Sequence, residues 1–84
     1  MYLAKVFITL KPGVLDPQGS AVEKALQALD FAGVQEVRIG KYMEVRLAAS
    51  DRRQAEADVQ EMCRRLLANP VIENYRFELV EVSA

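Results

Sequence analysis

The segment Gln35–Leu47 alternates between apolar and polar side chains without a break, and this constrains the fold more than any other feature of the chain. A repeat of two residues places every apolar side chain on one face of an extended backbone, which is typical of β-structure with one buried face. Because Gly40-Lys41 supplies turn residues in the middle of the segment, we expect two strands joined as a hairpin. The apolar members are Val37, Ile39, Met43, Val45 and Leu47.

The charged residues of this segment indicate its register. A two-residue loop would pair Val37 with Glu44, which puts side chains of opposite character on one face. A three-residue loop at Gly40–Tyr42 pairs apolar with apolar residues and acidic with basic ones. The pairs are then Val37 with Val45, Ile39 with Met43, Arg38 with Glu44, and Glu36 with Arg46. One long bent strand is the alternative, because unbroken alternation fits it as well.

Two further strands are predicted at the ends of the chain. In the first, from about Tyr2 to Lys11, the even positions are apolar and Phe7 falls on the polar face. Pro12-Gly13 ends this strand. In the last strand, Val71–Val82, the inward residues are Tyr75, Phe77 and Leu79, after which the apolar positions shift to Val80 and Val82. This change of parity predicts a bulge or a change of partner face.

Two helices are predicted between the strands. The first begins at about Ser20, where Ser20 and Glu23 form a capping box, and ends at Gly33 in the left-handed conformation. Asp16-Pro17 can instead be the cap and first turn of this helix. Its expected buried face is Val22, Ala25, Leu26 and Leu29. The second helix runs from a cap at Ser50 to about Ala68, with a stripe of Ala55, Val59, Met62, Cys63 and Leu66.

The order of elements predicts an α+β two-layer sandwich, βαββαβ, formed as a single domain of residues 1–84. Both helices would cover one face of an antiparallel sheet, in a ferredoxin-like outline. The bare face would carry Phe7, Tyr42, Val80 and Val82, and exposed apolar groups there predict self-association. A chain of 84 residues buries little surface by itself, and its one cysteine allows no internal disulfide, so we expect a homodimer or tetramer.

The composition argues against catalysis by this chain alone. There is no histidine, and Cys63 lies on an apolar helix stripe where a thiol is inert, so no activated nucleophile is expected. The residues show no metal-ligand spacing and no phosphate-binding glycine loop. A net charge of −1 without a basic face disfavours nucleic acid as a partner. The N-terminal segment reads as a strand and no apolar run is long enough for a membrane helix, so we expect a cytoplasmic protein.

Three segments are candidates for function, although each also has a plain structural explanation. Lys11–Gly19 is a polar turn that leads into a helix N-terminus, where free amides can meet an anion or a partner loop. Arg38-Ile39-Gly40-Lys41 places two cations around a glycine at the predicted hairpin tip. Leu67–Tyr75 is explained by a helix end followed by a strand.

These same segments resemble the PurS family. Lys11–Gly19, which reads KPGVLDPQG, is similar to the KxGVLDPQG segment of that family. Val37–Lys41, VRIGK, resembles its VRxGK turn, and Leu67–Glu73, LANPVIE, is similar to its LLxNPVIE segment. The order and spacing hold over essentially the whole chain.

The resemblance implies a non-catalytic subunit of phosphoribosylformylglycinamidine (FGAM) synthase. Members of the family act with the PurL synthetase and the PurQ glutaminase, which convert formylglycinamide ribonucleotide, ATP and glutamine to the amidine. The small subunit bridges these partners as a dimer and supports ammonia transfer. It binds no cofactor itself, whereas the complex uses ATP and Mg²⁺. The surface residues expected to meet partners are Lys11, Asp16, Pro17, Gln18, Gly19, Arg38, Gly40 and Lys41.

Two other classes compete with this interpretation. An RNA-binding module shares the βαββαβ order but needs stacking aromatics on both central strands, and the strand at Met43–Arg46 offers none. A small-molecule-binding regulatory module of ferredoxin-like fold is the closer alternative.

Overall fold

The computed structural model describes residues 1–82 and contains one antiparallel sheet, two α-helices and a short π-helical turn. The strands are β1 (Tyr2–Leu10), β2 (Gly40–Leu47) and β3 (Glu73–Glu81), in the spatial order β2-β1-β3. The helices are α1 (Pro17–Ala28) and α2 (Arg52–Met62), and α2 continues as η1 (Cys63–Leu67). None of the helices in these residues is long and apolar enough to span a bilayer.

The core lies between α2 and one face of the sheet. The even residues of β1, from Tyr2 to Ile8, are buried, which confirms the predicted inner face of this strand. The buried cluster is completed by Leu79 of β3, by Ala55, Val59 and Cys63 of α2 and η1, and by Ala68 after η1. Arg52 ties the helix to the sheet edge, because its Nη2 donates to the Leu79 carbonyl at 2.7 Å.

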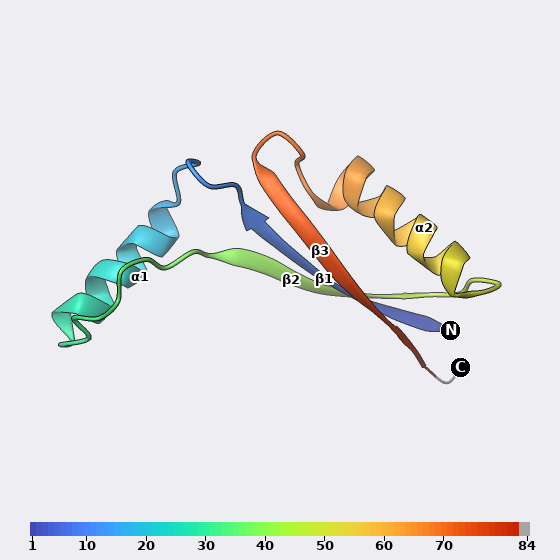
Figure 1. Cartoon of the computed structure of the whole chain (residues 1–84), viewed down its shortest axis with the longest axis horizontal. Helices are drawn as coiled ribbons and strands as arrows, with labels where there is room; N and C mark the ends of the chain where they lie inside the picture. Colours follow the sequence, from blue (N-terminus) through green and yellow to red (C-terminus); the bar gives the residue numbers. More distant parts are fainter. Residues whose placement is uncertain (83–84) are drawn as a thin grey trace.

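Helix α1 lies away from this core, beyond one end of the sheet (Figure 1). Only Gly19 of this helix is buried. The prediction of an α+β fold with an antiparallel sheet is confirmed, but only α2 covers the sheet, so the expectation that both helices share one face is wrong for a single chain. Val22 and Leu29, expected to be buried, are 40% and 67% exposed. We call residues 11–39, which include α1 and the extended return to β2, the arm.

The predicted hairpin within residues 35–48 is not formed. Gly40–Leu47 pairs with β1 from Tyr2↔Leu47 to Thr9↔Gly40, and the opposite edge of β2 has no ladder partner in residues 1–82. The residues from Val34 to Ile39 form neither helix nor strand. The alternative of one extended segment is closer to the structure, since no turn reverses the chain at Gly40.

The helix ends differ from the predicted ones for local reasons. Helix α1 begins at Pro17, because Asp16 caps it and Pro17 fits the first helical position, as the alternative interpretation held. It ends at Ala28, and the left-handed residue is Asp30 (φ 73°) rather than Gly33. Helix α2 is capped by Asp51 instead of Ser50.

The C-terminal part of α2 and the last strand also differ from what the sequence pattern predicts. The π-helical turn, in which the Ala68 amide donates to the Cys63 carbonyl, rotates the stripe so that Leu66 is 82% exposed. Pairing of β3 with β1 is continuous from Leu10↔Glu73 to Tyr2↔Glu81, so the predicted bulge after Leu79 is absent from this ladder. Val80 instead faces the bare side of the sheet beside Leu3, where the strand's parity places it.

Candidate functional site: a junction of three segments

The three segments that the sequence singles out meet at one end of the sheet, where the arm leaves it. We call this region the junction and define it as residues 10–19, 37–41 and 69–73. Its parts are linked by backbone contacts, since the Lys11 amide donates to the Ile72 carbonyl at 2.8 Å. A depression of about 250 Å³ lies between the segments and is lined by Ile8, Leu10, Asp16, Pro17, Gln18, Ile39, Gly40, Lys41 and Glu73.

Asp16 holds the first two segments together. Its Oδ1 accepts the Gly19 amide at 2.9 Å, which caps α1, and its Oδ2 accepts the Ile39 amide at 2.8 Å. These two amides, the Ile39 amide foremost, lower the pKa of the Asp16 carboxyl below its ordinary value, with a smaller contribution from the charge of Arg38. The carboxylate is buried in this position and serves the fold rather than a partner.

Arg38 and Gly19 are also structural. Arg38 Nη2 donates to the carbonyls of Lys11 at 3.0 Å and Leu10 at 3.2 Å. Its guanidinium therefore links the segment before β2 to the end of β1. Gly19 packs so closely that a Cβ there would collide with the Val37 carbonyl oxygen. The structure gives these residues contacts within the chain, and their contact with a partner stays a prediction.

Glu73 links the third segment and was not anticipated as a site residue. Its Oε1 accepts the Asn69 amide at 2.7 Å, and its Oε2 lies 3.6 Å from the Lys41 ammonium. The Glu73 side chain is 11% exposed, whereas the Lys41 side chain is 62% exposed. The signal available in the sequence is the helix-ending Asn69-Pro70 followed by an acidic residue, a pattern that by itself predicts only a helix end and a strand start.

The outer rim of the junction consists of exposed residues. Pro17, Gln18 and Lys41 are exposed, Lys11 is partly so, and Leu15 is 80% exposed. Among residues 1–82 there is no group of three side chains able to hold a metal ion. The rim offers two ammonium groups, an amide and apolar groups, a set suited to contact with another protein.

The bare face of the sheet is a second surface and carries the residues predicted for self-association. Phe7 lies between Tyr42 of β2, with ring centroids 5.1 Å apart, and Arg76 of β3, whose guanidinium lies 4.0 Å above the Phe7 ring. The Tyr42 hydroxyl donates to Glu44 at 2.8 Å, and this contact raises the pKa of Tyr42. Val82 continues the pairing of β3 with β1 beyond the last ladder pair, because its amide donates to the Met1 carbonyl at 2.9 Å.

The junction and the arm together define a class of protein: a small, non-compact α+β chain with a surface for protein contacts at one end of its sheet. Comparison with known proteins gives its family. A model of the PurS family, described as phosphoribosylformylglycinamidine (FGAM) synthase, matches residues 3–81. The chain belongs to the PurS family.

Individual relatives agree over the full length. The Bacillus subtilis (strain 168) protein named phosphoribosylformylglycinamidine synthase subunit PurS is 56% identical over 84 residues, which cover 100% of this chain and 99% of the relative. The Thermus thermophilus PurS structure superposes with a TM-score of 0.86 at 46% identity, covering 98% of each chain. A chain of the Thermotoga maritima PurLQS structure gives a TM-score of 0.84 at 26% identity, covering 95% of this chain and 99% of that chain.

Because these superpositions cover nearly the whole chain, they include the arm as well as the sheet. The extended shape is therefore shared with experimentally solved relatives. The comparisons give no support to the alternative of a small-molecule regulatory module.

Proposed function

We propose that the chain is the PurS subunit of FGAM synthase in purine biosynthesis, a non-catalytic component that works beside a PurL synthetase and a PurQ glutaminase. The observation that carries this is the 56% identity to a PurS subunit over the entire chain. A relative of the same fold in a PurLQS structure supports assembly with those two proteins. The complex, which we place in the cytoplasm, would use ATP and Mg²⁺ on its larger subunit, and this chain would bind neither.

The side chains support a role in assembly rather than in chemistry. Cys63 is fully buried, and burial raises the pKa of its thiol, so it does not supply a thiolate. With no histidine in the sequence, no side chain has an ordinary pKa near neutrality. The contribution of the chain to ammonia transfer would then be to hold the two catalytic subunits in place.

The rim of the junction is the surface we assign to PurL or PurQ. Its exposed members are Pro17, Gln18 and Lys41, with Lys11 partly exposed, while Asp16, Gly19, Arg38 and Gly40 fix its shape through contacts within the chain. Arg38 is a poor probe of partner binding, because reversing its charge would also break its bonds to the Leu10 and Lys11 carbonyls. Gln18 is a better probe, since its side chain is exposed at the rim.

Self-association is the other part of the proposal. The radius of gyration is 16.5 Å, whereas a compact chain of this length has about 12 Å. A single copy with an arm beside its sheet buries little of the arm's apolar surface. A homodimer would cover the apolar surface of the arm. A dimer of dimers would also cover the bare face of the sheet, with Phe7, Tyr42, Val80 and Val82.

Reconstitution tests the function. The purified chain alone should show no turnover of glutamine, ATP or formylglycinamide ribonucleotide. Added to PurL and PurQ, it should restore glutamine-dependent synthesis, while activity with free ammonia should depend on it much less. Gln18→Arg should weaken complex formation, and Lys24→Gln, an exposed change on α1 outside the rim, should not. Glutamine-dependent synthesis at full rate without the chain would refute the proposal.

A further inference from the structure

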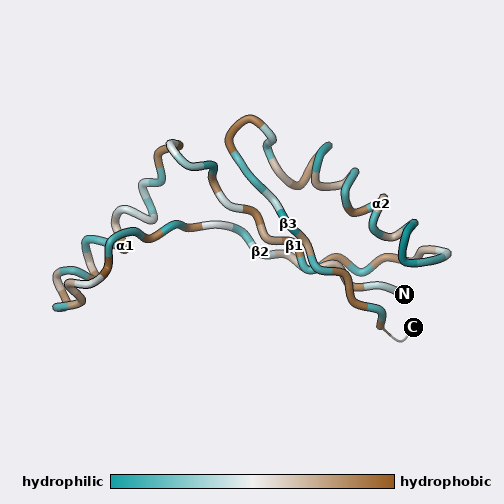
Figure 2. The backbone as a smooth tube through the Cα atoms, viewed as in Figure 1, coloured by the Kyte–Doolittle hydropathy of each residue, from teal (hydrophilic) through white to brown (hydrophobic). Residues whose placement is uncertain are grey.

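The short connection between η1 and β3 presents apolar side chains to solvent. Val71 is 79% exposed and Ile72 is 39% exposed, and Pro70 before them is exposed as well. Figure 2 shows hydrophobic residues at this bend of the backbone. We call residues 69–72 the 69–72 turn. Its apolar side chains belong neither to the hydrophobic core nor to the rim of the junction.

Hydrogen bonds within the chain hold the 69–72 turn in one shape. The side-chain oxygen of Asn69 accepts the Val71 amide at 3.1 Å, and the Asn69 carbonyl accepts the amides of Ile72 at 3.2 Å and Glu73 at 2.7 Å. The Asn69 amide donates to the Glu73 carboxylate at 2.7 Å. Pro70 adds a fixed φ. The turn is therefore ordered before it meets a partner and loses little conformational entropy on binding.

The same bonds decide what kind of ligand the turn can take. Pro70 has no amide hydrogen, and the amides of Asn69, Val71 and Ile72 all donate within the chain. A turn that binds a phosphate or a carboxylate does so with free backbone amides. Because the amides of this turn are already used, its contribution to binding is the burial of apolar side chains. The surface that fits it is an apolar pocket of another protein.

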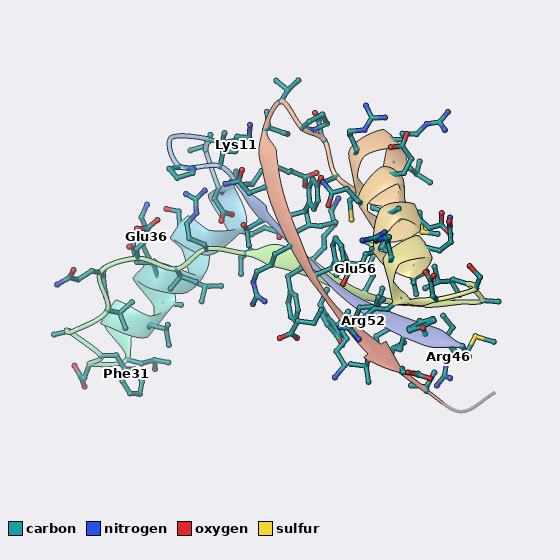
Figure 3. The ribbon with its side chains drawn as sticks, turned by 45° about the vertical axis from the view of Figure 1, so that its right-hand side comes forward. Lys11, Phe31, Glu36, Arg46, Arg52 and Glu56 are labelled. Carbon is teal, nitrogen blue, oxygen red and sulfur yellow. The ribbon has the colours of Figure 1, made fainter. Side chains whose placement is uncertain are left out.

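The turn is continuous with the rim of the junction. The Ile72 carbonyl accepts the Lys11 amide at 2.8 Å, and Figure 3 shows Lys11 beside the turn. Glu73, which follows the turn directly, lies 3.6 Å from the Lys41 ammonium. A partner that covers the rim therefore meets the 69–72 turn in the same contact.

Cations surround the turn and define the charge of the partner. Arg64 and Arg65 lie on η1, which leads into the turn, and they share one carboxylate, that of Glu61, at 2.6 Å and 3.9 Å. The lysines joined to the turn, Lys11 and Lys41, share the carboxylate of Glu73. This excess of positive charge is complementary to a pocket with acidic residues at its margin.

We propose that the 69–72 turn inserts Val71 into an apolar pocket of a larger FGAM synthase subunit, with carboxylates of that subunit facing Lys11 and Lys41. This inference rests on the proposed function and adds an apolar anchor to its polar rim. An apolar centre with a charged margin is the usual anatomy of a protein interface. The anchor explains why a turn with so many internal hydrogen bonds keeps an aliphatic side chain in solvent.

Substitutions at Val71 test the anchor by biolayer interferometry of the immobilised chain with PurL and PurQ, each alone and together. Val71→Asp should weaken binding by at least about thirtyfold, because it would place a carboxylate in an apolar pocket. Val71→Ala should weaken it by about fivefold through lost methyl groups. Ala57→Asp introduces the same carboxylate at an exposed position of α2 and should stay within about twofold. Equal affinities of the Val71→Asp and Ala57→Asp variants would overturn the proposal.

The melting temperatures of both Val71 variants should stay close to the native value, because the side chain is 79% exposed. If Val71→Asp does not fold, Val71→Ala decides the question. An affinity of Val71→Ala equal to that of the unaltered chain would then overturn the anchor.

Binding kinetics separate the anchor from its charged margin. Charges at the margin of an interface act mainly on the association rate, whereas buried contacts act mainly on the dissociation rate. Lys11→Glu, which keeps the backbone bond to Ile72, should slow association. Val71→Ala should speed dissociation. An unchanged association rate for Lys11→Glu would overturn the acidic margin, and a Val71→Ala variant that altered only association would overturn burial of the side chain.

The outcomes for this inference and for the proposed function are distinct. An unaltered chain that binds neither PurL nor PurQ would overturn both. Normal assembly and synthesis with Val71→Asp would overturn only the anchor. Loss of binding in Val71→Asp, with an unaltered chain that binds but does not restore synthesis, would overturn only the assigned function. Sedimentation of Val71→Asp alone as a smaller species than the unaltered chain would place Val71 against a second copy and overturn the anchor as well.

Discussion

At the scale of single residues, the carboxylate of Asp16 connects parts of the chain that are 23 positions apart. One oxygen accepts the Gly19 amide, which has no partner within α1. The other oxygen accepts the Ile39 amide and so holds the extended segment that leads back to β2. Two charge-assisted bonds from one buried carboxylate set the direction in which the arm leaves the sheet. The direction of the arm therefore depends on a residue whose local sequence suggests only a turn or a helix cap.

The first prediction concerns the ionisation of Asp16. Its folded pKa lies below the ordinary 3.8 because two amides stabilise the charged form. The carboxylate thus contributes stability that is present above the unfolded pKa and is lost as the pH falls through the folded pKa. Asp16→Asn should lower the melting temperature at pH 7, and the gap to the native chain should narrow below about pH 4. Asp30→Asn, an exposed carboxylate without such bonds, is the control, and a gap independent of pH would contradict the account.

A pair of glycines provides the second prediction. At Gly19 an added Cβ would collide with the Val37 carbonyl, whereas at Gly33 it would meet nothing within 4 Å. Gly19→Ala should therefore destabilise the fold by about 1–3 kcal/mol, as overpacking does. Gly33→Ala should stay within about 1 kcal/mol, since its φ is not positive and the unfolded chain loses freedom. Urea unfolding of both variants makes the comparison, and equal losses would show that the approach of the two segments is not tight.

At the scale of elements, strand faces were predictable and helix ends were less so. The alternation in β1 and β3 gave the correct inner residues, because one buried face imposes a period of two. The π-helical turn at Cys63–Leu67 was not predictable, since the stripe continues through Leu66 in the sequence and only the backbone shows the extra residue per turn. The caps at Asp16 and Asp51 compete with Ser20 and Ser50, which are equally good capping residues on propensity alone.

The third prediction concerns Cys63, where α2 passes into the π-helical turn. The side chain is fully buried among apolar residues, so Cys63→Ser should lower the free energy of unfolding by about 1–3 kcal/mol through burial of a hydroxyl. Activity of the reconstituted complex should be nearly unchanged. Leu66→Ser, at an exposed position of the same turn, should cost less than about 0.5 kcal/mol. Loss of complex activity in a well-folded Cys63→Ser variant would mean that the thiol has a functional role.

At the scale of the whole molecule, the candidate site was easier to predict in place than in role. Lys11–Gly19, Arg38–Lys41 and Leu67–Tyr75 were found from residue chemistry and resemblance, and the structure brings them to one sheet end. That Asp16, Gly19 and Arg38 would be tied up inside this junction depends on contacts between segments far apart in sequence, which no local pattern encodes. The hairpin failed for a related reason, because the alternation of Gly40–Leu47 is satisfied equally well by pairing with β1, a strand far away in the sequence.

The last prediction follows from the exposed helix of the arm. If apolar residues of α1 are covered by a second copy, the melting temperature should rise with protein concentration, because association stabilises the folded state by mass action. Leu29→Asp should remove most of that dependence while the far-ultraviolet circular dichroism stays native, since Leu29 is 67% exposed in one chain and contributes little to its own core. Lys24→Asp, which introduces the same carboxylate at an exposed polar position of α1 and changes the charge even more, should retain the dependence. Differential scanning fluorimetry over a hundredfold range of concentration provides the measurement. A Leu29→Asp variant with the native concentration dependence would show that this face of α1 stays in solvent in the oligomer.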